Sequence, residues 1–297
     1  MLPPMYPPAF PPMETPAPPY PPTPPYPPSE PPLPSAPPEH HARVKALFDQ
    51  FTVAESQHRE DELHRLSAWT YLTTIQYDEI IRDALDAMDP PVRSNHTIFE
   101  LGCGVGAALK AVQRLVGKVR PAGCDVSRRA LDVAEAVFRP HANAFMLADM
   151  GASRGLAHIP SGSFDHVVSF GALAMYLDHK EMANALREAS RIARPGASLC
   201  FTHFLAPGGE PLGTIVAPVQ RTDLESMARR VGLSNITFHA MRYQGERYAM
   251  TCRSPWSSSR LPTESRRRGF ERRDATFESK RTNSTALFRS LAHSSTW

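Results

Sequence analysis

The chain has 297 residues, enough for one large domain or two small ones, and carries a formal net charge of +3. Residues 256–297 hold nine basic and four acidic side chains, so the rest of the chain is slightly acidic and offers no basic surface for nucleic acid. Its four cysteines are far apart, without zinc spacing, and no run reaches the roughly 20 apolar residues of a membrane span. We expect reduced cysteines, no metal, no membrane partner and a cytoplasmic protein, with Arg266-Arg267-Arg268 leaving a nuclear address open.

The two end segments differ in composition from the middle. Residues 1–38 contain 20 of the 31 prolines and neither lysine nor arginine. Proline lacks a backbone N–H and fixes φ, so this composition predicts a disordered, extended tail over residues 1–39. Pro3-Pro4-Met5-Tyr6 is typical of WW-domain ligands, which leaves open either a partner with a WW or SH3 domain or a plain spacer. Residues 255–297, rich in Ser and Arg, predict a second disordered tail.

Residues 40–90 have the apolar spacing of helices. Apolar side chains recur at steps of three and four in residues 42–51 and again in residues 77–88, where Asp89-Pro90-Pro91 ends the pattern. Three aromatic residues lie in this segment: Trp69, Tyr71 and Tyr77. They either pack against the rest of the fold or cover a bound cation with an aromatic face. We predict a helical cap that precedes the sheet.

A glycine-rich turn follows the first predicted strand. A strongly apolar run leads to Glu100, then to Gly102, Gly104 and Gly106, and then to an amphipathic segment. Glycine at a strand-to-helix turn lets the backbone bend sharply and approach a ligand, and the helix presents its N-terminal N–H groups to that ligand. Gly102 and Gly104 with Ala107 also fit the dinucleotide-binding fingerprint, so the glycines alone predict a nucleotide-binding corner of either kind.

Strands and helices then alternate, as in a parallel α/β sheet. Four further strands are predicted over residues 119–125, 143–147, 164–170 and 198–204. Ser127 is the expected N-cap of the helix after the second strand. An Ile-Ala-Arg-Pro-Gly stretch ends the helix before the fifth strand, and another helix is predicted over residues 221–231. Residues 236–243 and 247–252 predict a closing hairpin.

The stretch Glu100-Leu101-Gly102-Cys103-Gly104-Val105-Gly106 is similar to the first motif of class I S-adenosylmethionine (SAM)-dependent methyltransferases: an acid, any residue, then three alternating glycines. The acids and strands that follow, and the closing hairpin, extend the resemblance over about residues 60–254. It implies an α/β, Rossmann-like sheet of seven strands, mostly parallel with the last strand antiparallel, helices on both faces and an N-terminal helical cap. The implied domain covers residues 40–254, with the cap at 40–90 and the core at 97–252.

The resemblance also implies the cofactor, S-adenosyl-L-methionine, and the residues that hold it. Asp125, at the end of the second strand, accepts from the ribose hydroxyls, although a dinucleotide enzyme would use it in the same way and a helix cap is the alternative. Asp149 accepts from the adenine amino group beside an apolar neighbour, or else is a surface acid. The implied cofactor-binding residues are Glu100, Gly102, Gly104, Gly106, Asp125, Val126, Asp149, Met150 and Phe170.

The implied reaction is an in-line displacement in which an N, O or C nucleophile takes the methyl group. His203 and Tyr176, near the carboxyl ends of predicted strands, are the candidate catalytic residues, and a satisfied strand histidine is the alternative for His203. No Asn/Asp-Pro-Pro-Tyr string follows the fourth strand. With the absence of a basic surface, this makes a small molecule the first expected acceptor, a protein the second, and nucleic acid unexpected. The sequence also leaves open a scaffold protein and, with less weight, an NAD-type oxidoreductase.

Overall fold

The computed structural model describes residues 60–66, 72–205, 219–243 and 247–255, which all lie within one compact unit, Leu33–Trp297. The predicted proline tail, the predicted helix at residues 42–51, the aromatic residues Trp69 and Tyr71, and all but Pro255 of the predicted basic tail lie outside these ranges. None of the helices in the described part of the chain has the length and apolarity that a bilayer crossing requires.

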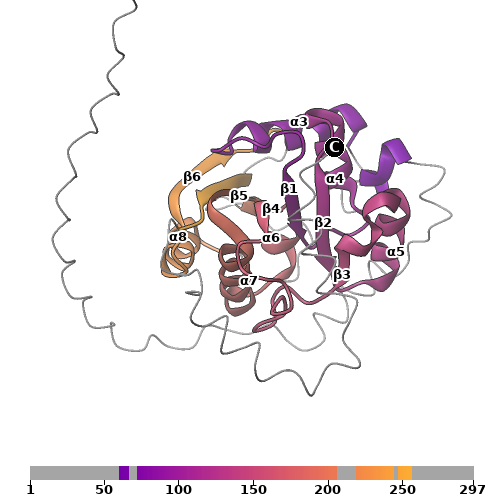
Figure 1. Ribbon diagram of the computed structural model, residues 1–297. Helices are drawn as coiled ribbons and strands as arrows, with labels where there is room; N and C mark the ends of the chain where they lie inside the picture. The colour runs from indigo at the N-terminus through magenta and orange to yellow at the C-terminus, as the bar shows by residue number, and fades with distance from the viewer. Residues whose placement is uncertain (1–59, 67–71, 206–218, 244–246, 256–297) are drawn as a thin grey trace, which may run out of the picture. The chain divides into compact units, whose positions relative to one another are not determined.

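A single seven-stranded sheet organises the described residues, in the order β3-β2-β1-β4-β5-β7-β6 (Figure 1). The strands are β1 (Thr97–Leu101), β2 (Arg120–Asp125), β3 (Phe145–Leu147), β4 (Phe164–Ser169), β5 (Ala193–Leu205), β6 (Ser234–Ala240) and β7 (Arg247–Arg253). The pairs that link β3, β2, β1, β4 and β5 are parallel, whereas β7 runs antiparallel to both β5 and β6. The predicted fold class, including the antiparallel last strand, is confirmed.

Helices cover both faces of the sheet (Figure 1). They are η1 (Glu60–Leu66), α3 (Thr74–Asp86), α4 (Ala107–Val116), α5 (Arg128–Val137), η2 (Arg139–Ala144), α6 (Ala172–Tyr176), α7 (His179–Ile192) and α8 (Arg221–Arg230). Successive strand residues point to opposite faces, so Ile98 packs into a core with η1, α3, α4 and α5, and Phe99 into a core with α6, α7 and α8. Both faces of the central strands are therefore buried, which explains why these strands are apolar without alternation.

Short-range hydrogen bonds fix where the main helices begin. Ser127 caps α5 by accepting from the N–H of Ala130, as predicted. The helix α3 begins with a reciprocal capping box between Thr73 and Gln76, and α7 begins with one between Asp178 and Glu181. These caps are readable in the sequence because both partners lie three residues apart.

Three strands differ from the prediction by two or more residues at a boundary. The strand β5 begins at Ala193, five residues early, because Ala193 pairs with Phe164 before the register shifts and Ser198 pairs with His166. The strand β3 covers only Phe145–Leu147, because the 3-10 turn η2 occupies the residues before it. The strand β6 starts and ends earlier than predicted, and its turn contains Tyr243 in a left-handed conformation with φ of 55°.

Side chains on the helix α3 attach it to the rest of the fold. Asp78 pairs with Arg114 of α4 at 2.5 Å, and Asp83 pairs with Arg242 of the β6–β7 turn at 2.8 Å. The hydroxyl of Tyr243 donates to Glu79 at 2.6 Å. The predicted cap is thus joined both to the helix that follows the glycine turn and to the closing hairpin.

Candidate functional site

The glycine turn after β1 has three residues in the left-handed region, with φ of 69° at Gly102, 51° at Gly104 and 79° at Gly106. A Cβ added to Gly102 would overlap the Cβ of Ala172, and one added to Gly106 would lie 2.7 Å from the ring of Phe138. At Gly104, an added Cβ would meet no described atom within 4 Å. Two of the glycines are thus required by packing, while the middle one leaves space beside the backbone, which is the place where a ligand can approach.

Asp125 stands at the end of β2 beside this turn. Its carboxylate accepts from the N–H of Gly104 at 2.8 Å and from the N–H of Ser127 at 2.9 Å, and the residue is 8% exposed. Both interpretations of this acid therefore have a structural basis, because the carboxylate fixes the start of α5 and also lies at the glycine turn. A ribose bound over Gly104 would find this acceptor next to it.

Glu100, on β1, is the most unusual polar group of the site. It is 3% exposed, and its Oε2 atom has no hydrogen-bond partner among the described residues. Burial raises the pKa of Glu100 well above its usual value, Asp125 raises it further, and the backbone N–H of Phe170 opposes this shift. An unpaired buried carboxylate is costly, and a cationic ligand group would remove that cost. Glu100 therefore fits the positively charged part of SAM.

The remaining predicted cofactor residues surround the turn unevenly. The end of the Met150 side chain packs against Gly102, with Cε 3.2 Å from the position that a Cβ on Gly102 would take. The backbone N–H of Phe170 donates to Glu100. Asp149 accepts from the N–H of Gly151 at 2.8 Å, so it shapes its own turn after β3. Val126 is half-buried directly after Asp125. The roles of these residues toward a cofactor remain predictions.

Of the two candidate catalytic residues, Tyr176 ends α6, the short helix after β4, and His203 lies near the carboxyl end of β5. Burial, followed by Asp125, raises the pKa of Tyr176 to about 12, so its hydroxyl keeps its proton at neutral pH. His203 is buried in an irregular stretch of β5 with φ of 72°, and its backbone N–H donates to Sδ of Met241 at 3.2 Å. Burial, followed by Arg247, lowers the pKa of His203 to about 3, so its imidazole is neutral near pH 7.

The sequence left two interpretations open for Tyr77 on α3, packing or covering a bound cation. It is buried, which confirms the packing interpretation for this aromatic residue, and its ring stacks on His64 at 5.1 Å between centroids. Burial, followed by the charge of Glu100, raises the pKa of Tyr77 well above its usual value. The phenol therefore lies within electrostatic reach of the unpaired carboxylate. Helical spacing marked Tyr77 as a core residue but could not show what it faces.

Comparison with known proteins finds similarity to methyltransferases. Residues 98–196 match the family model of a methyltransferase domain. The [4+2]-cyclase SpnF has the same fold at a TM-score of 0.52 and 17% identity, over 76% of this chain and 99% of that one. A chain from the complex of the Haloferax volcanii Trm112 methyltransferase activator with a methyltransferase matches at a TM-score of 0.50 and 18% identity, over 70% of this chain and 98% of that one. A search of curated proteins gave no match.

The fold, the glycine turn and the family match agree. Residues 98–196 are similar to a methyltransferase domain, and the sheet that holds them has the Rossmann-like order expected for a class I SAM-dependent methyltransferase. The structural neighbours support the fold alone at these identities, and one of them is a cyclase, so the assignment of methyl transfer rests on the family model.

Proposed function

We propose that this enzyme moves the methyl group of SAM to an N, O or C nucleophile of a small molecule by in-line displacement. The observation that carries the proposal is the combination of open space at Gly104 with a buried carboxylate oxygen of Glu100 that lacks a partner in the described residues. A dinucleotide would bring a negatively charged pyrophosphate to this turn, which a buried carboxylate would repel, whereas a cationic cofactor would be attracted to it.

Each part of the turn has a role in this proposal. When bound, SAM supplies a methyl group on a sulfonium, which is already a reactive donor. Asp125 holds the ribose hydroxyls, Glu100 balances the positive charge, and Asp149 with Met150 holds the adenine. The backbone around Gly104 lets these groups come close and excludes water, so the protein contributes mainly position.

The acceptor is expected at the carboxyl ends of β4 and β5, where Tyr176 and His203 lie. An imidazole whose pKa is about 3 is a poor general base near neutral pH, and a phenol whose pKa is about 12 remains protonated. We therefore infer an acceptor whose nucleophile is already unprotonated at neutral pH, such as an aromatic amine or heterocyclic nitrogen, with Tyr176 and His203 acting as donors or orienting groups.

The remaining candidate functions have less support. An NAD-type oxidoreductase is disfavoured by the antiparallel β7 inserted between β5 and β6, which a dinucleotide-binding sheet does not need. A protein acceptor is the second choice, because no feature of the described surface favours a protein over a small molecule. Binding of the proline-rich segment to WW or SH3 domains is a separate proposal, which the full chain can be tested for with isolated domains of each type.

The test is calorimetric titration of the full chain with S-adenosylhomocysteine. We expect a dissociation constant of about micromolar order, weakened at least about tenfold by Asp125→Asn. The matched control is Asp132→Asn, because Asp132 is an exposed acid on α5 that pairs with Arg128. Absence of binding to the folded wild-type chain, or an equal loss in both variants, would contradict the cofactor assignment. Acceptors are then screened by transfer of label from the SAM methyl group.

A further inference from the structure

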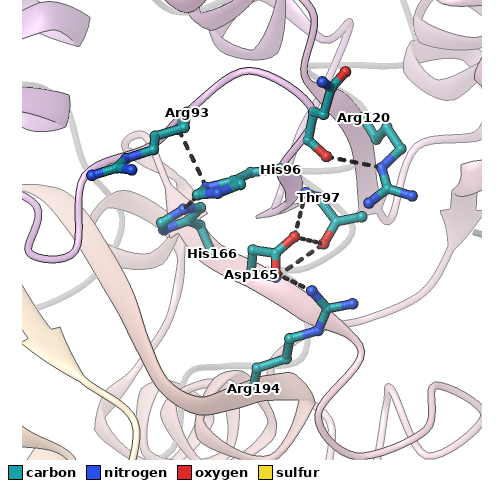
Figure 2. Close-up of polar contacts among 8 residues, drawn as sticks. Arg93, His96, Thr97, Arg120, Asp165, His166 and Arg194 are labelled. Atoms are coloured by element: carbon teal, nitrogen blue, oxygen red, sulfur yellow. Dashed lines mark hydrogen bonds and ion pairs between the residues drawn. The ribbon is translucent and has the colours of Figure 1, made fainter. Parts of the chain in front are cut away.

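Most of the buried polar side chains in the described ranges have partners inside the protein. At the amino ends of β1 and β4, for example, Asp165 accepts from the N–H of Thr97 at 2.8 Å and from its hydroxyl at 2.7 Å, and pairs with Arg194 (Figure 2). Two buried side-chain oxygens lack a partner in the described ranges: Oε2 of Glu100 and the hydroxyl oxygen of Tyr248. The cofactor proposal uses the first of them and leaves the second unexplained.

Tyr248 lies at the same edge of the sheet as the glycine turn. It is the second residue of β7, and it stands opposite Phe204, near the end of β5, and Ala240, the last residue of β6. Because β7 runs antiparallel to β5, its first residues lie beside the carboxyl end of β5. The strands β1, β4 and β5 are parallel neighbours, so the turn after β1 is three strands away along this edge.

Two phenylalanine rings flank the ring of Tyr248. Phe204 stacks on it with the centroids 5.7 Å apart, and Phe238 of β6 meets it edge to face at 5.4 Å. Tyr248 is 8% exposed, whereas Phe238 is half-buried, so the cluster opens toward solvent beside β6. A buried phenol normally has a hydrogen-bond partner, and one without it loses the bonds that it would make in water.

A guanidinium group lies at the open side of this cluster. Arg221, the exposed first residue of α8, places its Cζ atom 4.2 Å from the centroid of the Phe238 ring. Its charge also reaches the hydroxyl of Tyr248, because it partly offsets the rise that burial causes in the pKa of Tyr248. The pKa remains raised, so the phenol keeps its proton at neutral pH. A phenol donor and a guanidinium are therefore near each other without an acceptor between them among the described residues.

The other charges at this edge favour an anion. The N-cap of α8, Gln220, makes no side-chain capping hydrogen bond, and a helix N-terminus carries a partial positive charge. Arg247, next to Tyr248, is a second cation, and its charge contributes to the lowered pKa of His203. Asp223, exposed in the first turn of α8, is the opposing acid. Two cations and a helix N-terminus thus stand against one carboxylate.

We propose that the methyl acceptor carries an anionic group, a carboxylate or a phosphate, which binds to the hydroxyl of Tyr248 and the guanidinium of Arg221. An apolar part of the acceptor then lies against Phe204. The proposal rests on the proposed methyl transfer and names the substrate class of that same site. Three strand spacings of about 4.8 Å separate Tyr248 from β1, so the anion is about 14 Å from that strand and belongs to the far end of the acceptor.

The experiment is an NMR titration of the full chain labelled with carbon-13 in tyrosine and nitrogen-15 in arginine, with signals assigned by Tyr248→Phe and Arg221→Gln. The probes are 3-phenylpropionate and phenyl phosphate, and uncharged 3-phenylpropanamide is the matched neutral compound. We expect at least one anion to shift both signals and to bind about fivefold or more tightly than the amide. Which anion does so distinguishes carboxylate from phosphate. Equal affinities for the amide and both anions, or shifts that miss Tyr248, would overturn the proposal.

The same two variants test the contacts one at a time. Arg221→Gln and Tyr248→Phe should each weaken binding of the anion by about fivefold or more and leave the amide unaffected, because both retain the aromatic surface. Arg229→Gln is the matched control, because Arg229 is an exposed arginine near the other end of α8 that pairs with Glu225 at 2.6 Å. Equal losses in all three variants, or none in the first two, would refute the proposal.

Calorimetry with S-adenosylhomocysteine separates this inference from the proposed function. Arg221→Gln and Tyr248→Phe should bind it as the wild type does, because both residues lie away from the glycine turn. If the wild type binds S-adenosylhomocysteine but shows no preference for anions, only the acceptor class is wrong. If it prefers anions but does not bind S-adenosylhomocysteine, the proposed function fails and the anion site cannot be the acceptor site.

Discussion

The polar groups at the two ends of the parallel strands differ in where their hydrogen-bond partners come from. At the carboxyl end, Glu100 has a buried oxygen without a described partner, and Gly104 has open space beside it. At the amino end, Asp165 accepts hydrogen bonds from Thr97 and Arg194. The rings of His96 and His166 also lie within hydrogen-bond distance of each other. Both ends belong to the same buried strands, so burial does not explain the difference. We therefore expect the ligand at the end where hydrogen bonding among the described residues is incomplete.

The largest expected effect comes from the packed glycine of the turn. Gly102→Val requires a β-branched residue at φ of 69° and a Cβ that overlaps Ala172, so we expect a loss of about 3–5 kcal/mol in the free energy of unfolding. Urea denaturation measures it. Gly104→Ala is the matched variant: its added Cβ meets open space, so it should destabilise the fold by only about 1–2 kcal/mol but still impair binding of S-adenosylhomocysteine. Equal stability losses in the two variants would contradict the distinction between them.

A smaller effect is expected at the amino end. Asp165→Asn removes the ion pair with Arg194 and one acceptor for Thr97, which should cost about 1–3 kcal/mol of stability. Because the pKa of Asp165 is lowered in the folded protein, its contribution is present above the ordinary value of 3.8 and is lost as the pH falls through the lower folded value. In the variant, the free energy of unfolding should therefore depend less on pH below about 3.8, while the affinity for S-adenosylhomocysteine stays unchanged. A large loss of affinity would show that the two ends are coupled.

The charge of Glu100 should control cofactor affinity by about tenfold, or about 1.4 kcal/mol. Its pKa is raised, so the carboxylate takes up a proton at a higher pH than an ordinary glutamate does, and affinity should decrease as the pH falls through that raised value. Glu100→Gln should bind more weakly at neutral pH and lose this pH dependence. Calorimetry over a pH series measures both, and an identical pH profile in the variant would exclude Glu100 as the cause.

The smallest effect is expected where the closing hairpin meets α3. Arg242 is largely exposed, so Arg242→Gln should remove its pairing with Asp83 at a cost of a few tenths of a kcal/mol. Added salt should reduce the difference between variant and wild type, because it screens the exposed pair. Thermal unfolding at two salt concentrations measures this. A loss above about 1 kcal/mol would mean that the hairpin holds α3 more firmly than a surface ion pair allows.

The features predicted from the sequence are those set by neighbours along the chain. The turn at Gly102, Gly104 and Gly106, the cap at Ser127 and the alternation of strands and helices all depend on residues within one or two turns of each other. The position of Asp125 beside Gly104 also followed, because the carboxyl ends of neighbouring parallel strands meet at one edge.

The features that were missed depend on partners far apart in the sequence. Ala172 packs on Gly102 and Tyr77 comes within electrostatic reach of Glu100 only after the sheet has formed, and no periodicity encodes either pairing. The early start of β5 depends on a register shift against β4, which moves an Arg-Pro-Gly segment into the strand. The contact between His96 and His166 joins residues 70 positions apart, and neither position alone indicates the other.

The insertion of β7 between β5 and β6 fixes the order in which the sheet can be completed during synthesis. In the described sheet β6 pairs with β7 and has no other strand beside it. A nascent chain that has emerged only as far as Ala240 would therefore hold a five-stranded parallel sheet with β5 as an open edge and with β6 unattached. Translation has to pass Arg253 before β7 can pair with both β5 and β6. Until then the apolar edge of β5 is the place where a chaperone, or another nascent chain, would bind.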